Sequence, residues 1–137
     1  MSMGRIAAWV CAGLTLAAAP LEAHHSFAAQ FDPERPITLH GVVTKIDWMN
    51  PHVYFYVDVV EEDTGETANW GIEMGPPHQL ERRSWKRNSM QIGDVITVEA
   101  TRARDGSHLA NARRVTLEKT GEVLGAASSE AQTIGRE

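Results

Sequence analysis

The stretch His52-Val53-Tyr54-Phe55-Tyr56-Val57-Asp58-Val59 decides the fold class, because apolar and polar residues alternate along it without interruption. Strict alternation is the pattern of a half-buried β-strand, in which successive side chains point to opposite faces of a sheet. The valines and Phe55 are expected to face the core, and Tyr54, Tyr56 and Asp58 to face outward. This is the clearest strand of the chain, and the fold is expected to be built around it.

Strand patterns also occur on both sides of this stretch. Residues 37–48 precede it, with an Asn-Pro turn at 50–51 between them, and residues 68–74 follow it after the Asp-Thr-Gly turn at 63–65. Turn sequences of this kind between alternating segments indicate hairpins. The three segments are therefore expected to form an antiparallel meander.

The rest of the domain should contain one helix and two more strands. Residues 78–85 follow two prolines and lack glycine and β-branched residues, which favours a short helix. Glycine-containing turns precede the expected strands at 95–100 and 109–117. The order β-β-β-α-β-β predicts an all-β fold with one short helix, a five-stranded barrel like the oligonucleotide/oligosaccharide-binding (OB) fold. An open sandwich of the same strands is the alternative.

The N-terminus has the three-part layout of a signal peptide. Arg5 precedes an apolar or small-residue run at 6–19, and a small residue, Ala23, follows shortly after it. The run is too short for a comfortable transmembrane helix. Residues 1–23 are therefore expected to be removed, which would make the protein periplasmic or secreted, with no integral membrane segment after processing. Cleavage after Ala19 is the alternative.

After cleavage at residue 23, the chain should divide into an arm at 24–36, the β domain at 37–118 and a tail at 119–137. The tail is rich in Gly, Ala, Ser and Glu without any period, so we expect it to be disordered. Cys11, the only cysteine, lies in the leader, so the mature protein would contain no disulfide.

Charge argues against nucleic acid as a partner. The 13 Lys and Arg residues are interspersed with 18 Asp and Glu residues, and the net charge of −5 provides no field that attracts a polyanion. No nucleophile motif is present, and the carboxylates of Asp58 and Glu73 on neighbouring strands are expected to be outward and solvated. We therefore expect a monomeric binding protein and not an enzyme.

Four short motifs together carry a resemblance to a known family: His24-His25-Ser26-Phe27, Trp48-Met49-Asn50-Pro51-His52, Ile92-Gly93-Asp94 and Ala110-Asn111-Ala112-Arg113. In these motifs the chain resembles an uncharacterised bacterial family of small exported proteins with a domain of unknown function, over nearly all of the mature sequence. The resemblance implies export and a small β domain. It implies no catalytic residue.

Copper binding is the sharpest functional hypothesis. Cleavage after residue 23 would give His24 a free amine beside its imidazole, a pair that can chelate a transition metal, and His25 adds a second imidazole. His52 can complete a planar Cu(II) site, and the thioether of Met49 suits Cu(I). In an OB topology His52 and His108 lie on loops at one rim, where they can converge. A solvated terminus that binds nothing is the alternative interpretation.

A non-catalytic OB module that binds a sugar, a peptide or a planar small molecule is the second hypothesis. Tyr54 and Tyr56 are expected on the outer face, with Trp48 nearby, and exposed aromatic residues are a usual contact surface of OB folds. Strand propensity and cross-strand packing explain the same tyrosines without a ligand. The partner is thus expected to be a metal ion or a small ligand.

Overall fold

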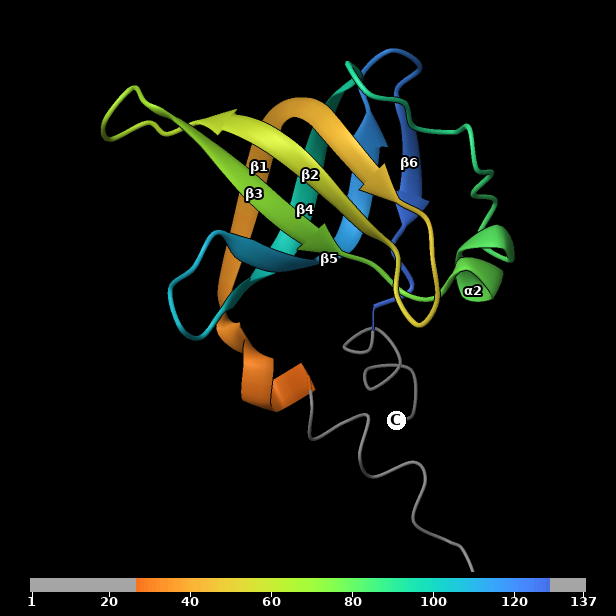
Figure 1. The fold of residues 1–137 in the computed structure, drawn as a ribbon, viewed down its shortest axis with the longest axis horizontal. Helices are drawn as coiled ribbons and strands as arrows, with labels where there is room; N and C mark the ends of the chain where they lie inside the picture. The colour runs from red at the N-terminus through yellow and green to blue at the C-terminus, as the bar shows by residue number, and fades with distance from the viewer. Residues whose placement is uncertain (1–26, 129–137) are drawn as a thin grey trace, which may run out of the picture.

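The computed structural model describes residues 27–128, which form a mostly β fold with two short helical segments (Figure 1). Residues 27–30 are helical and lead directly into the first strand. The elements that follow are β1 (Phe31–Asp47), β2 (Tyr54–Val60), β3 (Thr67–Glu73), the helix α2 (Pro77–Glu81), β4 (Val95–Ala103), β5 (Leu109–Leu117) and β6 (Glu122–Gly125).

The six strands belong to one sheet that closes into a ring. Neighbouring strands follow the order β3-β2-β1-β4-β5-β6, and β3 also pairs with β5 in parallel, which joins the two sides of the sheet. One edge of β5 pairs with β4, while the other receives β3 at residues 109–111 and β6 at residues 114–117. The expected all-β fold with a short helix between the third and fourth strands is confirmed, with six strands in place of five.

The core lies inside the ring and follows the alternation of the sequence. Val53, Phe55, Val57 and Val59 are buried, whereas Asp58 between them is exposed. The side chain of Trp70 from β3 and that of Trp85, which follows α2, are among the largest fully or nearly fully buried groups. The other members of the core are Leu39, Val43, Ile72, Met74, Leu80, Met90, Ile96, Val98, Ala100, Ala110, Ala112, Val115, Leu117, Leu124, Ala126 and Ala127.

β1 is long because it pairs with two strands in succession. Its second half pairs with β2 and its first half with β4, and the two regions overlap at Gly41 and Val42. A Cβ atom on Gly41 would lie 2.1 Å from the carbonyl oxygen of Asp58, so only glycine allows the backbones to approach so closely here. A register shift between Val43 and Lys45 then reverses which side chains face the core.

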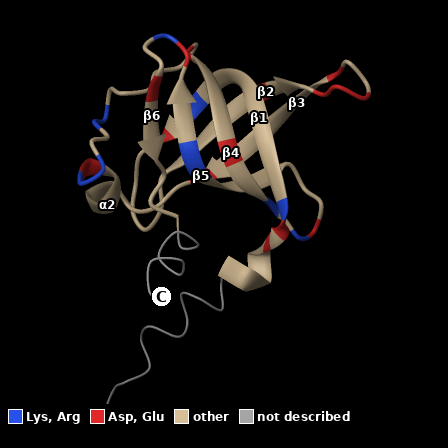
Figure 2. Cartoon of the chain, turned by 180° about the vertical axis from the view of Figure 1, so that it is seen from behind, with Lys and Arg blue, Asp and Glu red and all other residues tan. Residues whose placement is uncertain are grey.

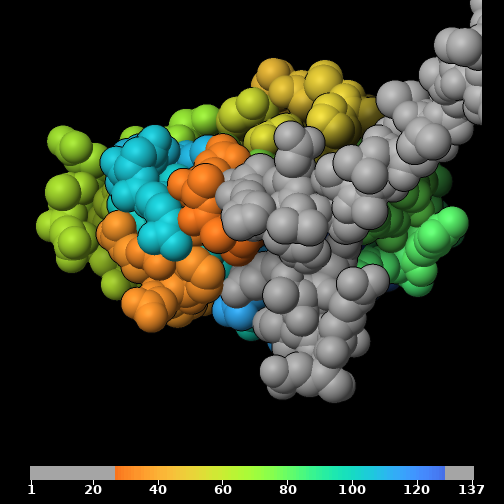
Figure 3. All heavy atoms as spheres, turned by 90° about the horizontal axis from the view of Figure 1, so that it is seen from below, coloured from red at the N-terminus to blue at the C-terminus, as the bar shows by residue number. Residues whose placement is uncertain are grey.

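The expected start of the domain at residue 37 is too late. β1 begins at Phe31, which pairs with Ala103 at the end of β4 and is fully buried. The residues between Phe31 and Pro36 are mostly exposed, and the register shifts there. No alternating pattern marks this part of the strand, which is why the sequence suggested an arm. Residues 27–30 pack beside the turn after β4, where the backbone NH of Arg104 donates to the carbonyl of Gln30 at 2.9 Å (Figure 3).

The expectation of a disordered tail from residue 119 is wrong for the part that the structure describes. β6 pairs with β5, and Leu124, Ala126 and Ala127 are buried. The small residues that suggested disorder permit close packing: a Cβ atom on Gly75 would lie 2.3 Å from the carbonyl oxygen of Ala127. The rest of the expected tail, residues 129–137, lies outside the described residues, as do the expected signal peptide and residues 24–26.

No helix within residues 27–128 combines the length and the apolar character needed to cross a bilayer.

An ion pair connects the turn before β4 to the turn between β5 and β6. Asp94 accepts hydrogen bonds from Lys119 Nζ at 2.7 Å and from the backbone NH of Gln91 at 2.8 Å. Lys119 holds the pKa of the Asp94 carboxyl below its ordinary value, partial burial opposes this effect, and the Gln91 NH adds to it. The charged carboxylate is thus favoured in the folded protein.

Replacing this carboxylate should reduce stability slightly and only above acidic pH. Asp94→Asn is expected to lower the free energy of unfolding by about 0.5–1 kcal/mol near pH 7, the range of partly exposed ion pairs. A depressed pKa contributes stability above the unfolded value, so the difference should shrink as the pH falls below about 4. Urea denaturation between pH 2.5 and 7 measures this difference in the free energy of unfolding between the variant and the unmodified protein. Glu122→Gln, at an exposed position, is the control. An equal difference at both pH limits would contradict this prediction.

Candidate functional site

A buried carboxylate lies at the end of β3, on the outer side of the sheet. Glu73 is only 5% exposed, and three polar side chains surround it. The Tyr54 hydroxyl donates to Glu73 Oε2 at 2.6 Å and Asn111 Nδ2 donates to Oε1 at 3.3 Å. His52 Nδ1 lies 3.1 Å from the same Oε1. We call these four residues, His52, Tyr54, Glu73 and Asn111, the Glu73 cluster.

Strand pairing brings the Glu73 cluster together from three separate parts of the chain. Tyr54 is the cross-strand partner of Glu73 in the β2–β3 ladder, and Asn111 is its partner in the parallel β3–β5 ladder. His52 immediately precedes Val53, whose backbone exchanges hydrogen bonds with Gly75 and Met74 at 3.2 and 2.8 Å. The loop that carries His52 is thereby fixed against the end of β3. The cluster therefore depends on closure of the ring.

The protonation of Tyr54 follows from its surroundings. Burial, with the hydrogen bond to Glu73 as a second cause, raises the pKa of the Tyr54 phenol well above its ordinary value. The phenol therefore stays protonated at physiological pH and acts as a hydrogen-bond donor to the carboxylate. On the other side of Glu73, the Asn111 Oδ1 atom is buried and has no hydrogen-bond partner among residues 27–128.

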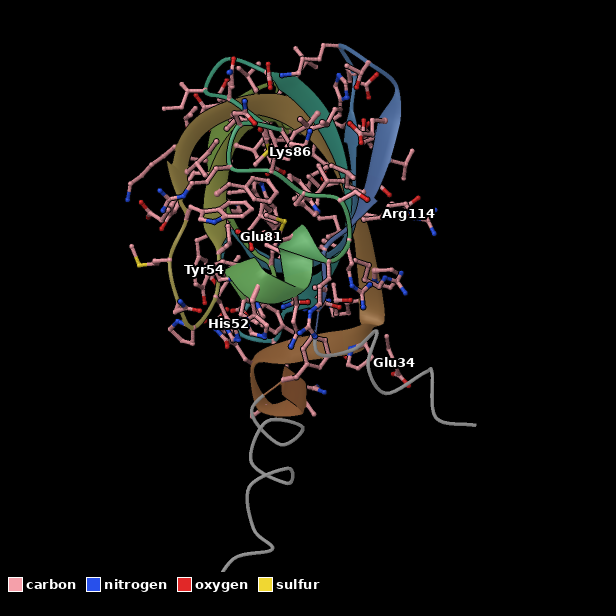
Figure 4. All side chains as sticks on the ribbon, turned by 90° about the vertical axis from the view of Figure 1, so that its right-hand side faces the viewer. Glu34, His52, Tyr54, Glu81, Lys86 and Arg114 are labelled. Atoms are coloured by element: carbon pink, nitrogen blue, oxygen red, sulfur yellow. The ribbon has the colours of Figure 1, made fainter. Side chains whose placement is uncertain are left out.

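His52 is the accessible member of the Glu73 cluster. Its side chain is 37% exposed, and its Nδ1 atom is the one that lies against the carboxylate. Figure 4 shows His52 in the lower part of the molecule, toward the helical residues 27–30, with Tyr54 above it. An imidazole with one nitrogen held by a carboxylate is the usual arrangement of a metal-binding histidine, because the contact fixes the orientation of the ring. The Nε2 atom is then the one that can bind a metal.

The described residues alone do not complete a metal site. Within residues 27–128 no group of three or more His, Cys, Asp or Glu side chains is arranged to hold a metal ion. Met49 lies three residues before His52 with 55% of its surface exposed and is not part of the Glu73 cluster. His24 and His25 lie outside the described residues. Within residues 27–128 the cluster thus offers one oriented imidazole and no complete set of metal ligands.

His108 lies against a different carboxylate. Its ring centroid is 4.9 Å from that of Trp70, and its Nε2 atom is 3.8 Å from Glu61 Oε1. His52 contacts Glu73, so the two imidazoles share no partner within residues 27–128. The topology places both histidines near β3, but the structure does not bring their rings to one site.

The aromatic residues of the second hypothesis make separate contacts. Tyr54 donates to Glu73, while the Lys45 ammonium lies 5.0 Å from the centroid of the Tyr56 ring. Trp48 is partly buried and packs against the core. Tyr56 faces Gly71 across the ladder, so one side of its ring has no cross-strand neighbour side chain. Tyr54, Tyr56 and Trp48 thus each have a different contact partner.

Sequence reasoning missed two members of the Glu73 cluster. The expectation that the Glu73 carboxylate is solvated is wrong, and Asn111 was noted only as part of a family motif. Counting outward from the 63–65 turn does place Glu73 opposite Tyr54. This register could have predicted from the sequence that the Glu73 carboxylate lies beside the Tyr54 side chain. The parallel β3–β5 pairing, which covers it with Asn111, has no local signal in the sequence.

Comparison with known proteins gives a family but no function. No curated protein and no solved structure is detectably similar to the chain. Residues 12–112, which include the whole Glu73 cluster, match the model of a family of unknown function, DUF6152. The expected resemblance to a family of unknown function is confirmed, and the chain belongs to the DUF6152 family.

Proposed function

We propose that this protein is an exported copper-binding protein in which His52 is one of the metal ligands. The observation that carries the proposal is the contact of His52 Nδ1 with the buried Glu73 carboxylate at 3.1 Å. This contact orients the ring and leaves Nε2 directed away from the carboxylate. Tyr54 and Asn111 hold Glu73 in place from its other sides.

The remaining ligands in this proposal come from the mature N-terminus. Removal of residues 1–23 in the periplasm gives His24 a free amine, which with its own imidazole chelates Cu(II), and His25 adds another imidazole. His24 lies three positions before Phe27, a reach of at most about 10 Å. Residues 27–30 and His52 lie toward the same end of the molecule (Figure 4), which supports this assignment. Met49, in the same loop as His52, is the candidate ligand for Cu(I).

Imidazole, amine and thioether donors favour copper over the alternatives. Calcium and magnesium prefer oxygen ligands, and a structural zinc site normally has four Cys or His ligands at close spacing. The proposed donor set is nitrogen-rich and open. We propose binding or transfer of the metal by a monomer, without catalysis by the protein itself.

We also propose that the fold is a five-stranded OB-like barrel with β6 added to the edge of β5. The ring β1-β2-β3-β5-β4, the parallel β3–β5 pairing and the position of α2 between β3 and β4 support it. In this arrangement the Glu73 cluster lies where β2, β3 and β5 meet.

The function is tested by titrating the protein as the cell processes it. Protein purified from the periplasm should have His24 as its first residue by intact mass, and should bind one Cu(II) with a nitrogen-rich paramagnetic resonance spectrum. Inserting one alanine before His24 should separate the amine from the imidazole, change the spectrum and weaken binding by about tenfold or more, or ~1.4 kcal/mol. His52→Ala should weaken binding and remove one nitrogen coupling.

A variant at an exposed histidine outside the proposed site serves as the control. His40→Ala removes an exposed imidazole on β1, whose ring nitrogen bonds Thr97 Oγ1 at 3.0 Å, and should leave the spectrum unchanged. A different N-terminal residue, or binding that is weak and insensitive to the alanine insertion, would overturn the copper proposal. That result would favour the alternative, a small organic ligand at the Tyr54, Tyr56 and Trp48 side chains.

A further inference from the structure

A second site lies at the opposite end of β2 from the Glu73 cluster. Pairing between β1 and β2 ends at Gly41 and Val59, whereas β1 continues to pair with β4 as far as Phe31. The two strands therefore separate beyond Gly41. A cavity of about 310 Å³ lies in this opening, lined by residues 37–40, residues 59–63, Trp70 and Arg102. The seven residues of β2 place it about 20 Å from the Glu73 cluster.

Arg102 supplies an unpaired positive charge to this cavity. Its guanidinium carbon lies 5.2 Å from the centroid of the Trp70 ring, a stacking contact that fixes the group. The Nε atom is buried without a hydrogen-bond partner, and the side chain makes no ion pair with residues 27–128. A partly buried arginine is normally paired, because an unpaired charge loses solvation without compensation. A ligand anion would supply the missing partner.

Carboxylates lie on the opposite wall of the same cavity. Glu61, Glu62 and Asp63 line it from the loop after β2, and Figure 2 colours acidic residues red on this loop. Glu61 is fixed by a hydrogen bond from Trp70 Nε1 to its Oε1 atom at 3.1 Å. Within residues 27–128, Glu62 and Asp63 make no ion pair, and none of the three lies within ion-pair distance of Arg102. Positive and negative groups therefore face one cavity without neutralising each other.

We propose that this cavity binds a small zwitterion, a molecule of the amino-acid class. Its carboxylate pairs with Arg102 in the bidentate manner of guanidinium groups, and its ammonium group lies among Glu61, Glu62 and Asp63. A purely anionic ligand is disfavoured by the acidic loop and by the net charge of −5. The volume is at the lower end of the range of small-molecule sites, which matches an amino acid rather than a larger ligand.

The unpaired strand edges strengthen this assignment. β1 at residues 37–40 uses its other edge for β4, so its edge toward the cavity has no partner strand in the β1–β2 ladder. Backbone NH and C=O groups on such an edge are free to bond polar groups of a ligand. An amino acid carries donors and acceptors of the same kind as these backbone groups.

The test is a titration of the mature ¹⁵N-labelled protein with each of the twenty common amino acids, followed by NMR. At least one should give saturable shifts at the amides of Thr38, His40 and Glu62. Acetate and methylammonium, which carry one charge each, should bind at least about tenfold more weakly. Arg102→Gln should reduce the amino-acid affinity by about tenfold, and the exposed Arg114→Gln, whose guanidinium pairs with Glu99, should not change it.

A second variant tests the same proposal if Arg102→Gln does not fold. Glu62 and Asp63 are exposed, so the double substitution Glu62→Gln with Asp63→Asn should leave the fold intact. It should weaken amino-acid binding severalfold without weakening acetate binding, because only the ammonium group loses its partners and the loop repels the acetate anion less. No saturable shift with any amino acid, shifts elsewhere, or acetate binding as tight as that of the best amino acid would overturn the proposal. None of these readouts involves copper.

Discussion

Ending the chain after Thr120 is expected to lower the free energy of unfolding by about 4 kcal/mol or to prevent folding. Leu124 is 4% exposed in the core, and its loss alone removes about 2–3 kcal/mol of apolar burial. The Gly125 carbonyl accepts a hydrogen bond from Trp85 Nε1 at 3.0 Å, so truncation leaves a core donor unpaired. The edge of β5 and the Gly75 NH lose their partners as well.

Equilibrium denaturation in urea measures this effect. The matched control ends the chain after Ser128, which keeps β6 and the buried residues 126–128. We expect the control to unfold near the midpoint of the full mature chain and the shorter chain to unfold at much lower denaturant. Equal midpoints for the two truncations would mean that β6 contributes nothing and that its packing in the structure is wrong.

Glu73→Gln is expected to lower the Cu(II) affinity by about 10–100-fold, the usual cost of losing a carboxylate that orients a metal-binding histidine. Glutamine keeps the volume of the side chain and can still bond the Tyr54 hydroxyl. It cannot provide the negative charge that lies against His52 Nδ1 in the unmodified protein. This decrease in Cu(II) affinity is expected only if the proposed function is correct. If Glu73 had a purely structural role, Glu73→Gln would lower the stability of the fold without changing the Cu(II) affinity.

Affinity and stability must therefore be measured separately for this variant. Loss of charge-assisted hydrogen bonds to Glu73 should cost about 1–3 kcal/mol in the free energy of unfolding. Copper affinity is then compared by competition with a chelator under conditions in which both proteins are fully folded by circular dichroism. Glu81→Gln, on the exposed face of α2, is the control and should match the unmodified protein in both measurements. A folded Glu73→Gln protein with unchanged affinity would show that His52 does not bind the metal through this contact.

The strands with strict alternation were predictable because one face of each is covered. In β2 and β3 the period-two pattern, the turn sequence between them and the burial of Val57 and Trp70 agree. The helix α2 was predictable from the two prolines before it. It ends earlier than expected, at Glu81, and Ser84 adopts a positive φ of 72°.

The first and last parts of the sheet were not predictable for a physical reason. Phe31 follows small and polar residues, and Leu124 adjoins only one other large apolar residue, the exposed Val123, so neither lies in an alternating pattern. Their burial depends on surfaces made by other elements, the end of β4 in one case and the edge of β5 in the other. Local composition therefore suggested an arm and a tail where tertiary pairing forms strands.

The sequence by itself determined the fold class, the order of the elements from β1 to β5, the candidate histidines and the family. The tertiary structure alone decided that Glu73 is buried and that Arg102 lies over Trp70 without an ion-pair partner among residues 27–128. Both depend on contacts between residues far apart in the chain: Asn111 reaches Glu73 only because β3 and β5 pair in parallel. The alternation of a strand sequence predicts which face of the sheet a residue occupies. The closure of the sheet determines which residues pack against that face, and the environment of a charged side chain depends on those residues.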